Sequence, residues 1–385
     1  MTQARKSWLT VHRWVGLLAG IFFVVMGLSG SFLVFYQEID AWLNPAIAES
    51  SVAAETKLVP IQRVLDAVNH QNSTWFLHSV FPPNDRSNVY HVWFIPKKDD
   101  GSKMREVLVD AYSVKVLGSR NAVPTIEFAQ NNIANTIYTL HYQLFIGEFG
   151  TTVVGIIGLF LLFSTISGIV IWWPKGKNWA VGLKLKQNVN GIRRYFDLHR
   201  TFGIYSVVFL MMLAFTGVFI SLTSYLTPIV SLFSSETPAD NPAPNIAPAN
   251  YTAINADASI AIAKKVFPQG VISCLWLPGA SSNAWRVTLK LPNAVGMAGG
   301  DANVWIDPAT GKVLAKQQHS QNSAGKRFMS WQLPLHDGSV LGLFGRVIVF
   351  IAGLVPLVLA VTGFNIWLKK RQARKAIMAK ASSSY

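Results

Sequence analysis

The sequence predicts a mainly α-helical membrane protein with four transmembrane helices, arranged as two parallel repeats, and two external α+β modules. Three observations carry this prediction. Of the 385 residues, 51% are hydrophobic and only 14% are charged, whereas an ordinary soluble domain has about 25% charged residues. Four apolar runs are long enough to cross a bilayer, which takes about 20 residues each. The two halves of the chain also match each other at a fixed spacing.

The four apolar runs divide the chain into eight segments. In order, these are the N-terminus with the first helix (1–36), the first external module (37–147), the second helix (148–174), a basic loop (175–198), the third helix (199–226), the second external module (227–340), the fourth helix (341–368) and a basic tail (369–385). The first run is longer than the core of a signal peptide and no small-residue cleavage site follows it, so we expect a retained helix.

The charged residues are distributed unevenly along these segments. Sixteen cations and one acid, Asp197, lie in three segments: before the first run, between the second and third runs, and after the fourth run. The remainder holds 18 cations and 18 acids, so the whole net charge of +15 lies on one side of the membrane. This positive-inside pattern predicts that both termini are cytoplasmic and that the two long segments are external. It explains the basic composition without a nucleic-acid partner.

The composition and motifs exclude several kinds of site. Cys274 is the single cysteine, so the chain forms no internal disulfide and has no CxxC zinc site, cysteine-ligated iron–sulfur cluster or covalently attached c-type haem. The sequence also lacks a GxGxxG motif after a strand, a Walker A motif and a GxSxG motif. It therefore gives no sign of a nucleotide-binding domain or of a serine hydrolase.

The two halves of the chain align with two spacings. A shift of 187 places His12-Arg13 on His199-Arg200, Gly16 on Gly203 and Gly30 on Gly217. A shift of 195 places Leu140-His141 on Leu335-His336, Gly158 on Gly353 and Gly168 on Gly363. Each half contains two crossings, so both halves have the same orientation in the membrane. We therefore expect a pseudo-twofold axis along the membrane normal.

The external segments resemble each other more weakly. Each begins with an expected helix, over 59–70 in the first and 257–267 in the second, and alternating stretches at 89–95 and 285–291 are typical of half-buried strands. These patterns predict one small α+β module with its own antiparallel sheet in each segment. A Pro-rich linker over 241–248 precedes the second module.

Four of the eight histidines lie near the ends of the four apolar runs. His12 and His199 are at the cytoplasmic ends of the first and third helices, and His141 and His336 precede the second and fourth helices on the outer side. Each pair consists of equivalent residues from opposite halves. A pseudo-twofold axis places such residues face to face, which is the arrangement that a bis-imidazole metal site requires.

Two b-type haems fit these pairs best. A six-coordinate b-type haem needs two opposed imidazoles, no covalent attachment and an apolar slot. Gly16 and Gly203 lie one helical turn after their histidines, where a missing side chain leaves room for a flat macrocycle. Arg13 and Arg200 follow the histidines directly and can pair with the propionates.

Two other interpretations of these histidines remain open. A histidine next to an arginine at a membrane interface often anchors to lipid headgroups. Zinc or copper is less suitable, because two histidines make an incomplete ligand set and no cysteine or carboxylate repeats beside them. The remaining histidines have no partner in the other half, and we expect them on loop surfaces; they are His70, His78, His91 and His319.

Several motifs together resemble a known family. They are the start Leu9-Thr-Val-His12-Arg13-Trp-Val-Gly16, its echo Asp197-Leu-His199-Arg200, the Leu-His pairs before the second and fourth helices, and the ending Ser167–Lys175. The sequence resembles the PepSY-associated transmembrane proteins, and most closely the bacterial inner-membrane ferric-siderophore reductases of the FoxB type. The external modules look like divergent PepSY domains. The resemblance implies a multi-pass protein of the bacterial inner membrane.

The resemblance also implies a function. It suggests two b-type haems, with His12, His199, His141 and His336 as axial ligands, and electron transfer across the membrane to a periplasmic ferric siderophore. The electron donor is then a quinol or a separate cytoplasmic protein, and membrane lipid surrounds the helices. The alternative is a non-enzymatic module that senses or binds peptides, in which the helices act only as anchors. The sequence identifies no catalytic residue for either function.

Overall fold

Four long apolar helices dominate the computed structural model, which describes residues 3–48, 57–69, 75–84, 87–97, 103–174, 183–186, 189–234, 253–279, 283–292 and 300–382. The expected Pro-rich linker over 241–248 and His70 lie outside the described residues. The chain divides into two units. We name them the membrane unit (Met1–Val34, His141–Thr223 and Leu335–Tyr385) and the sheet unit (Phe35–Leu140 and Ser224–Pro334).

The membrane unit is built from α1 (Gln3–Val34), α6 (Gly147–Trp172), α8 (Ile192–Ser221) and α12 (Gly342–Ser382). All four are long and apolar enough to cross a membrane, so the protein is a multi-pass membrane protein. The helix α12 continues well beyond the expected membrane boundary at residue 368 and takes up most of the basic tail. Its sequence there is rich in Lys, Arg and Ala, which are strong helix formers.

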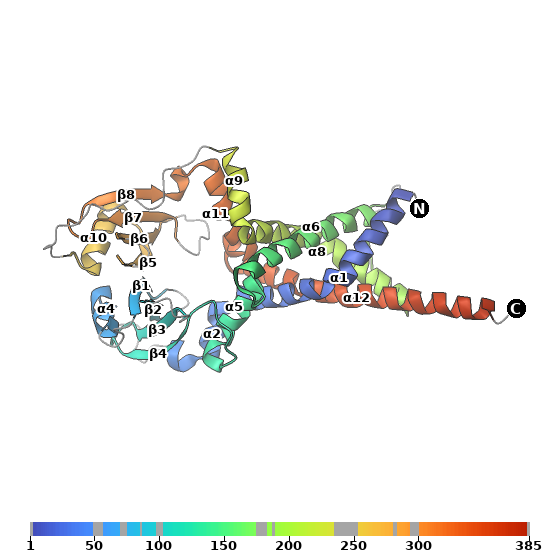
Figure 1. The fold of residues 1–385 in the computed structure, drawn as a ribbon, viewed down its shortest axis with the longest axis horizontal. Coiled ribbons are helices and arrows are strands. Elements are labelled where there is room, and N and C mark those ends of the chain that lie inside the picture. Colours follow the sequence, from blue (N-terminus) through green and yellow to red (C-terminus); the bar gives the residue numbers. More distant parts are fainter. Residues whose placement is uncertain are drawn as a thin grey trace. The chain divides into compact units, whose positions relative to one another are not determined.

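The four helices pack side by side, with α1 against α12 and α6, and α8 against α6 and α12 (Figure 1). Glycines allow the closest approaches. A Cβ atom on Gly27 of α1 would lie only 2.4 Å from the carbonyl oxygen of Gly353 of α12, and a Cβ on Gly353 would lie 2.2 Å from Oγ of Ser31. Only small residues permit two membrane helices to approach so closely.

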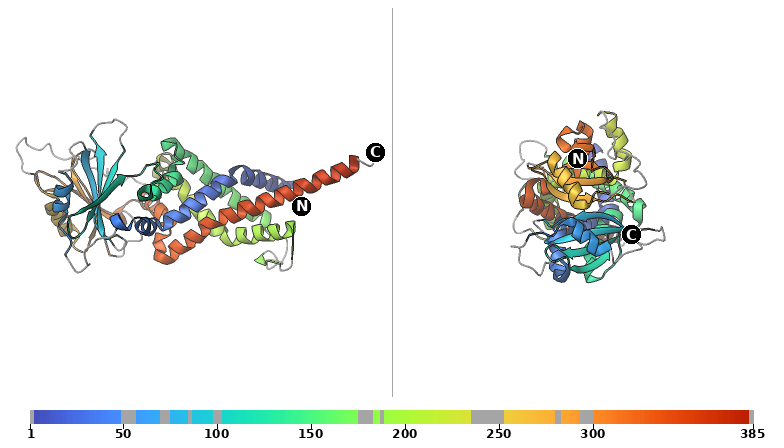
Figure 2. Two further views of the ribbon diagram at one scale, coloured as in Figure 1. Left: turned by 90° about the horizontal axis from the view of Figure 1, so that it is seen from below. Right: turned by 90° about the vertical axis from the view of Figure 1, so that its left-hand side faces the viewer.

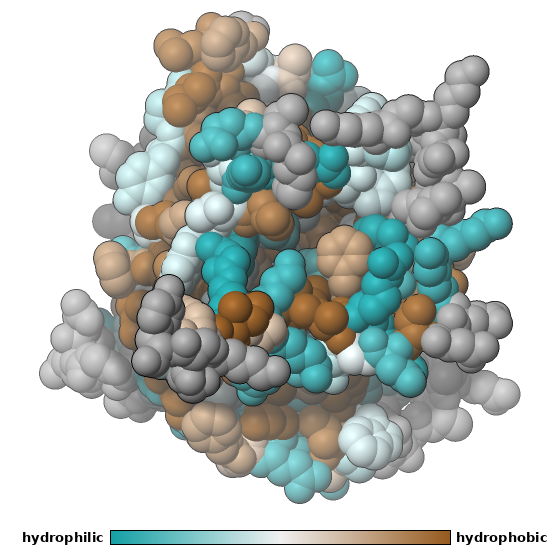
Figure 3. Space-filling view, turned by 90° about the vertical axis from the view of Figure 1, so that its right-hand side faces the viewer, coloured by the Kyte–Doolittle hydropathy of each residue, from teal (hydrophilic) through white to brown (hydrophobic). Residues whose placement is uncertain are grey.

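One end of the membrane unit carries the basic segments. His12 near the start of α1 lies beside His199 near the start of α8 and beside Ser167 near the end of α6, so these three helix ends lie together. Hydrophilic side chains gather on the face where both chain termini lie, with hydrophobic ones around them (Figure 3). This arrangement agrees with the uneven charge distribution in the sequence.

The sheet unit contains one antiparallel sheet of eight strands in the order β4-β3-β2-β1-β5-β6-β7-β8. Its strands are β1 (Trp75–Phe81), β2 (Val89–Pro96), β3 (Arg105–Asp110), β4 (Val116–Asn121), β5 (Val271–Trp276), β6 (Trp285–Lys290), β7 (Ala302–Ile306) and β8 (Val313–Gln318). Each half of the sheet is a meander of four consecutive strands. The expected strands over 89–95 and 285–291 are present as β2 and β6.

The two external segments share this sheet, which corrects the expectation of a separate sheet in each module. The strands β1 and β5 join the halves through the antiparallel pairs Ser79–Trp276 and Val80–Leu275. In a separate four-stranded meander, β1 or β5 would be an edge strand with unpaired backbone N–H and C=O groups. The pairing of β1 with β5 satisfies these groups.

Two helices cover one face of the sheet and bury its core. They are α4 (Ile61–Asn69) and α10 (Ala256–Val266), close to the helices expected over 59–70 and 257–267 (Figure 2). The core between them and the sheet includes Val64, Val92 and Val287, all fully buried.

Shorter helices connect these parts. They are α2 (Tyr36–Leu43), α3 (Pro45–Ala48), α5 (Ile133–Gln143), α9 (Thr223–Ser231) and α11 (Ala324–His336), with single 3₁₀ turns at Gln130–Asn132, His319–Gln321 and Ser339–Leu341. The last turn of α5 carries His141, and α11 ends at His336. The two outer histidines therefore lie where the chain returns to the membrane unit.

Candidate cofactor site

The structure brings the four helix-end histidines together as two pairs. The ring centroids of His12 and His199 are 6.3 Å apart, with ring planes at 85°. The ring centroids of His141 and His336 are also 6.3 Å apart, with planes at 50°. We name these the inner pair and the outer pair. Each pair joins residues from opposite halves of the sequence.

The spacing of the rings suits one metal ion between them. When two opposed imidazoles bind one metal ion, each metal–nitrogen bond is about 2.0 Å long, and each ring centre lies about 1.1 Å beyond its nitrogen. The two ring centroids are then about 6.2 Å apart. Two rings in direct stacking contact lie closer than this. The observed 6.3 Å in both pairs therefore fits two axial ligands of one iron.

A hydroxyl group meets Nδ1 of each histidine in the inner pair. Nδ1 of His12 lies 2.8 Å from Oγ of Ser167 on α6. Nδ1 of His199 lies 3.0 Å from Oγ1 of Thr362 on α12 and 3.0 Å from the carbonyl oxygen of Leu359. Ser167 and Thr362 are themselves 195 residues apart, the same spacing that relates the second and fourth helices.

The outer pair has the same arrangement. Nδ1 of His141 lies 2.9 Å from Oγ of Ser29 on α1, and Nδ1 of His336 lies 2.9 Å from Oγ1 of Thr216 on α8. Ser29 and Thr216 are 187 residues apart. Each of the four histidines is thus held by a hydroxyl residue from the other membrane helix of its own half.

These contacts favour one arrangement of protons on each ring. Each hydroxyl lies within hydrogen-bond distance of a carbonyl of its own helix, to which it can donate its proton; the acceptors are Val25 for Ser29, Ser164 for Ser167, Met212 for Thr216 and Val358 for Thr362. The hydroxyl oxygen then accepts the proton of Nδ1. In a neutral imidazole this is the Nδ1–H tautomer, which leaves the Nε2 lone pair to bind a metal.

A glycine follows each hydroxyl residue and contacts the same ring. A Cβ atom would lie 3.0 Å from Cε1 of His141 if built on Gly30, and 3.1 Å from Cε1 of His336 if built on Gly217. The corresponding distances are 3.7 Å between Gly168 and His12 and 3.2 Å between Gly363 and His199. The absence of a side chain lets the Cε1 edge of each ring approach the helix that holds it.

There is also open space along α1. Apart from neighbouring parts of α1 itself, no atom lies within 4 Å of the position that a Cβ on Gly16 or Gly20 would take, and Gly20 is buried. A flat apolar group can occupy such a space. Together with the ring spacing, this makes the residues present compatible with a haem.

The two arginines next to the inner histidines differ in their surroundings. Nε of Arg13 and Nε of Arg200 are both buried and, among the described residues, have no hydrogen-bond partner. Arg200 is also engaged through a terminal nitrogen, which donates to the carbonyl of Lys184 at 2.9 Å and lies 3.3 Å from a carboxylate oxygen of Asp197. The carboxylate already beside Arg200 leaves Arg13 the better placed of the two to meet an anionic group such as a propionate.

The other described histidines lie outside these pairs. His78 and His91 are half-buried on β1 and β2, so the expectation that they occupy loop surfaces is wrong; His319 begins a 3₁₀ turn. His91 is held by Glu106 on the neighbouring strand at 2.7 Å. In the described part of the chain, no group of three or more His, Cys, Asp or Glu side chains is arranged to hold a metal ion.

A buried charge network lies in the first half of the sheet unit. Arg120, which is 5% exposed, donates to Glu106 at 2.5 Å and to Asp40 of α2 at 2.8 Å. Burial alone would raise the pKa of Glu106, but Arg120 and His91 hold that pKa well below its usual value. Glu106 and Asp40 in turn raise the pKa of Arg120. The network ties β3 and β4 to α2.

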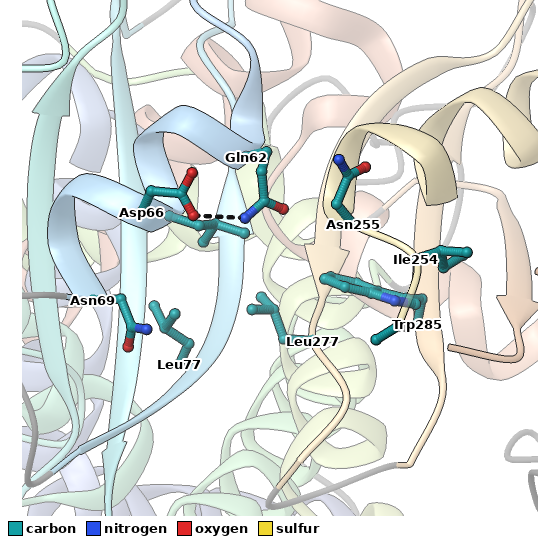
Figure 4. Close-up of a pocket in the computed structure, with 10 residues that line it drawn as sticks. Gln62, Asp66, Asn69, Leu77, Ile254, Asn255, Leu277 and Trp285 are labelled. Atoms are coloured by element: carbon teal, nitrogen blue, oxygen red, sulfur yellow. Dashed lines mark hydrogen bonds between the residues drawn. The ribbon is translucent and has the colours of Figure 1, made fainter. Parts of the chain in front are cut away.

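The sheet unit also contains a cavity of about 280 Å³ on the helix-covered side of the sheet (Figure 4). Its polar lining comes from α4 and from the residues before α10, and Asp66 accepts a hydrogen bond from Gln62 there at 2.7 Å. Trp285 lines it with 7% of its surface exposed, and its Nε1 has no hydrogen-bond partner among the described residues.

Sequence reasoning identified the four histidines but missed the hydroxyl residues that hold them. The signal was available, because Ser29-Gly30, Ser167-Gly168, Thr216-Gly217 and Thr362-Gly363 are four Ser/Thr-Gly pairs at the spacings of 187 and 195. The hydroxyl residue changes between Ser and Thr from one half to the other, so only the glycines are identical in the two halves.

Comparison with known proteins agrees with this architecture. No curated protein gives a significant match to the chain. The family described as the PepSY-associated TM region matches residues 9–370, which include α6, α8, most of α1 and α12, and both halves of the sheet. The chain therefore belongs to the PepSY-associated TM region family.

Proposed function

We propose that the protein is a dihaem b oxidoreductase of the bacterial inner membrane that passes electrons across the bilayer and reduces a periplasmic ferric siderophore, releasing Fe(II). The halves of the chain are two parallel repeats, both termini are cytoplasmic, and the external segments are PepSY-like modules. The inner pair, His12 and His199, holds one haem on the cytoplasmic side. The outer pair, His141 and His336, holds the other on the periplasmic side.

One observation carries this proposal: two imidazole pairs, each with centroids 6.3 Å apart, in which a hydroxyl oxygen lies within 3.0 Å of Nδ1 of every ring. A lipid-anchoring histidine needs neither a partner ring nor a buried hydroxyl group at Nδ1. The pairs also lie at opposite ends of the helices. Ser29, which contacts His141, lies 17 positions after His12 on α1. At about 1.5 Å per residue this is about 26 Å, close to the thickness of a bilayer core.

The chemistry of the site is one-electron transfer. A bound haem supplies a carrier that alternates between Fe(III) and Fe(II). The histidines ligate it, the hydroxyl residues orient the histidines, and the apolar helices exclude water from the path. For the overall reaction, one quinol loses two electrons and two protons to become a quinone, and two ferric siderophores each accept one electron. Fe(II) suits hard oxygen ligands less well than Fe(III), so reduction loosens the metal.

The donor is a membrane quinol or a separate cytoplasmic protein. The two histidines of the outer pair are close in sequence to the sheet unit, since α5 and α11 run from it. The siderophore is therefore expected to bind near this end of the protein.

Purified protein reduced with dithionite, freed of excess reductant and mixed with ferric siderophore tests this function. We expect the haem bands to reoxidise and Fe(II) to appear in a ferrous-specific chelator at one equivalent per haem. Haem that stays reduced with several chemically different ferric siderophores would contradict the substrate but not the electron-transfer role. Addition of quinol to the oxidised protein then identifies or excludes the quinol as donor.

The cavity beside Trp285 favours a second candidate, a module that binds peptides. A buried indole N–H without a partner, next to amide and carboxylate groups and an apolar floor, suits a peptide carbonyl with a small apolar side chain. In this function the helices serve only as anchors. The colour of the purified protein separates the candidates, because an anchor needs no haem and gives no reduced-minus-oxidised haem bands.

A further inference from the structure

The four Ser/Thr-Gly pairs form a recurring element of the membrane unit. In each one, the hydroxyl oxygen lies 2.8–3.0 Å from Nδ1 of one histidine, and the following glycine faces Cε1 of the same ring. We name each hydroxyl–glycine pair an imidazole seat. The seats are Ser29-Gly30 for His141, Ser167-Gly168 for His12, Thr216-Gly217 for His336 and Thr362-Gly363 for His199.

A backbone carbonyl joins the seat of His199. The carbonyl oxygen of Leu359, three positions before Thr362, lies 3.0 Å from Nδ1 of His199. A carbonyl can only accept a hydrogen bond, so at this ring it requires the proton on Nδ1 independently of the hydroxyl group. In all four seats, the hydroxyl oxygen at Nδ1 and the glycine at Cε1 together restrict the position of the ring.

The packing of the hydroxyl residues supports a specific role. The exposed fractions are 7% for Ser29, 0% for Ser167, 1% for Thr216 and 4% for Thr362. A buried hydroxyl costs free energy unless it is fully hydrogen-bonded. An alanine would fill almost the same volume as the serines, and a valine almost the same volume as the threonines. Each hydroxyl instead both donates to its own helix and accepts from a histidine.

We propose that the four seats are positioning residues for the haem ligands, which set the plane and the basicity of each imidazole and thereby the reduction potential of each haem. This inference rests on the proposed function. A hydrogen bond from Nδ1–H increases electron donation through Nε2 and so stabilises the ferric state. Loss of the hydroxyl acceptor weakens that donation and shifts the potential of the affected haem to a more positive value.

The ring planes give the seats a spectroscopic signature. In a low-spin ferric haem, two axial imidazoles with perpendicular planes donate to different iron d orbitals and leave them close in energy, which gives a highly anisotropic EPR signal. Ring planes that are nearer to parallel separate these orbitals in energy and give a more rhombic EPR signal. The planes are at 85° in the inner pair and at 50° in the outer pair. We therefore expect two distinguishable low-spin signals, the more anisotropic one from the inner pair.

Single substitutions test the seats in the intact protein. Ser167→Ala or Thr362→Ala should shift the potential of the inner haem to a more positive value and change the more anisotropic EPR signal, without altering the other haem. Ser29→Ala or Thr216→Ala should do the same for the outer haem. The conservative variants Ser29→Thr, Thr216→Ser, Ser167→Thr and Thr362→Ser, which exchange the residues found in the two halves, should keep the wild-type potential and signal.

The controls are hydroxyl residues of the same helices that touch no histidine. Thr165 donates to the carbonyl of Leu162 and Ser206 to that of Phe202, both at 2.7 Å, so Thr165→Ala and Ser206→Ala should leave both haems unchanged. If an alanine variant loses its haem, the conservative variant at that position must retain it; loss in both variants would overturn the positioning role. Two haems with unmoved potentials and EPR signals in all four alanine variants would overturn it as well. Wild-type protein without haem would instead overturn the proposed function.

Discussion

The imidazole rings of His12 and His199 lie 6.3 Å apart with their planes at 85°, although the two residues are separated by 187 positions in the chain. A ligand bound between them is held jointly by α1 and α8, one helix from each half of the sequence. The outer pair is shared between the halves in the same manner, by α5 and α11. Removal of a single histidine therefore breaks one shared site and leaves the other complete.

Substitution of one ligand should remove one haem. We expect His12→Ala to reduce the haem content of purified protein from two to one per chain, and His336→Ala to do the same for the other haem. Haem content by the pyridine haemochrome assay and low-temperature spectra measure the loss. The matched control is His319→Ala, since His319 lies on a 3₁₀ turn of the sheet unit. Single variants that all retain two low-spin haems would show that the histidines are not the axial ligands.

Close packing of α1 and α12 should be needed for both sites. A side chain on Gly353 meets the carbonyl oxygen of Gly27 at 2.7 Å and Oγ of Ser31 at 2.2 Å, so Gly353→Leu must push the helices apart. Overpacking of this kind costs about 1–3 kcal/mol, and we expect a lower Tm and loss of haem from both pairs. Ile351→Leu is the control, because Ile351 lies on the same helix α12 and is 56% exposed. Unchanged Tm and haem content in Gly353→Leu would refute this packing.

The buried network around Glu106 should stabilise the sheet unit at neutral pH. Glu106→Gln removes one partner of buried Arg120, and breaking such a pair costs about 3 kcal/mol. Thermal unfolding followed by tryptophan fluorescence is a suitable measurement, because Trp93 contacts Glu106. Asp66→Asn, on the surface of α4, is the control and should have little effect.

The same network predicts a pH dependence. The pKa of Glu106 in the folded protein is lower than its unfolded value of about 4.3, so the unfolded chain binds the proton more readily. The stabilisation is fully present above that unfolded value and is lost as the pH falls towards the folded pKa. Between pH 5 and pH 3, wild-type protein should therefore lose more stability than Glu106→Gln. Equal losses would mean that Glu106 carries no depressed pKa.

The charge distribution predicts the topology. Lys57 and Lys316 are exposed residues of the sheet unit, and Lys375 is exposed on the basic end of α12. A membrane-impermeant maleimide should label Lys57→Cys and Lys316→Cys in cells with an opened outer membrane, and Lys375→Cys only after the inner membrane is breached. The native Cys274 is 3% exposed and gives little background. The opposite labelling pattern would reverse the orientation.

The amino-acid sequence by itself determined the membrane helices, the spacing between the halves and the four histidines. These features depend on composition, on periodicity and on residue identity, which are properties of short stretches of chain. The expected helices and strands of the sheet unit were also recognisable, since amphipathic periodicity follows directly from which face is buried.

Only the tertiary structure decided which groups meet. The ring spacing in each pair, the contact of Ser29 with His141 and the joining of the two meanders at Ser79 and Trp276 each depend on residues more than a hundred positions apart. Glu106, Arg120 and Asp40 likewise show no pattern in the sequence, because an ion pair leaves no periodic trace. Such contacts arise when whole helices and strands pack, and local sequence preferences carry no information about the partner.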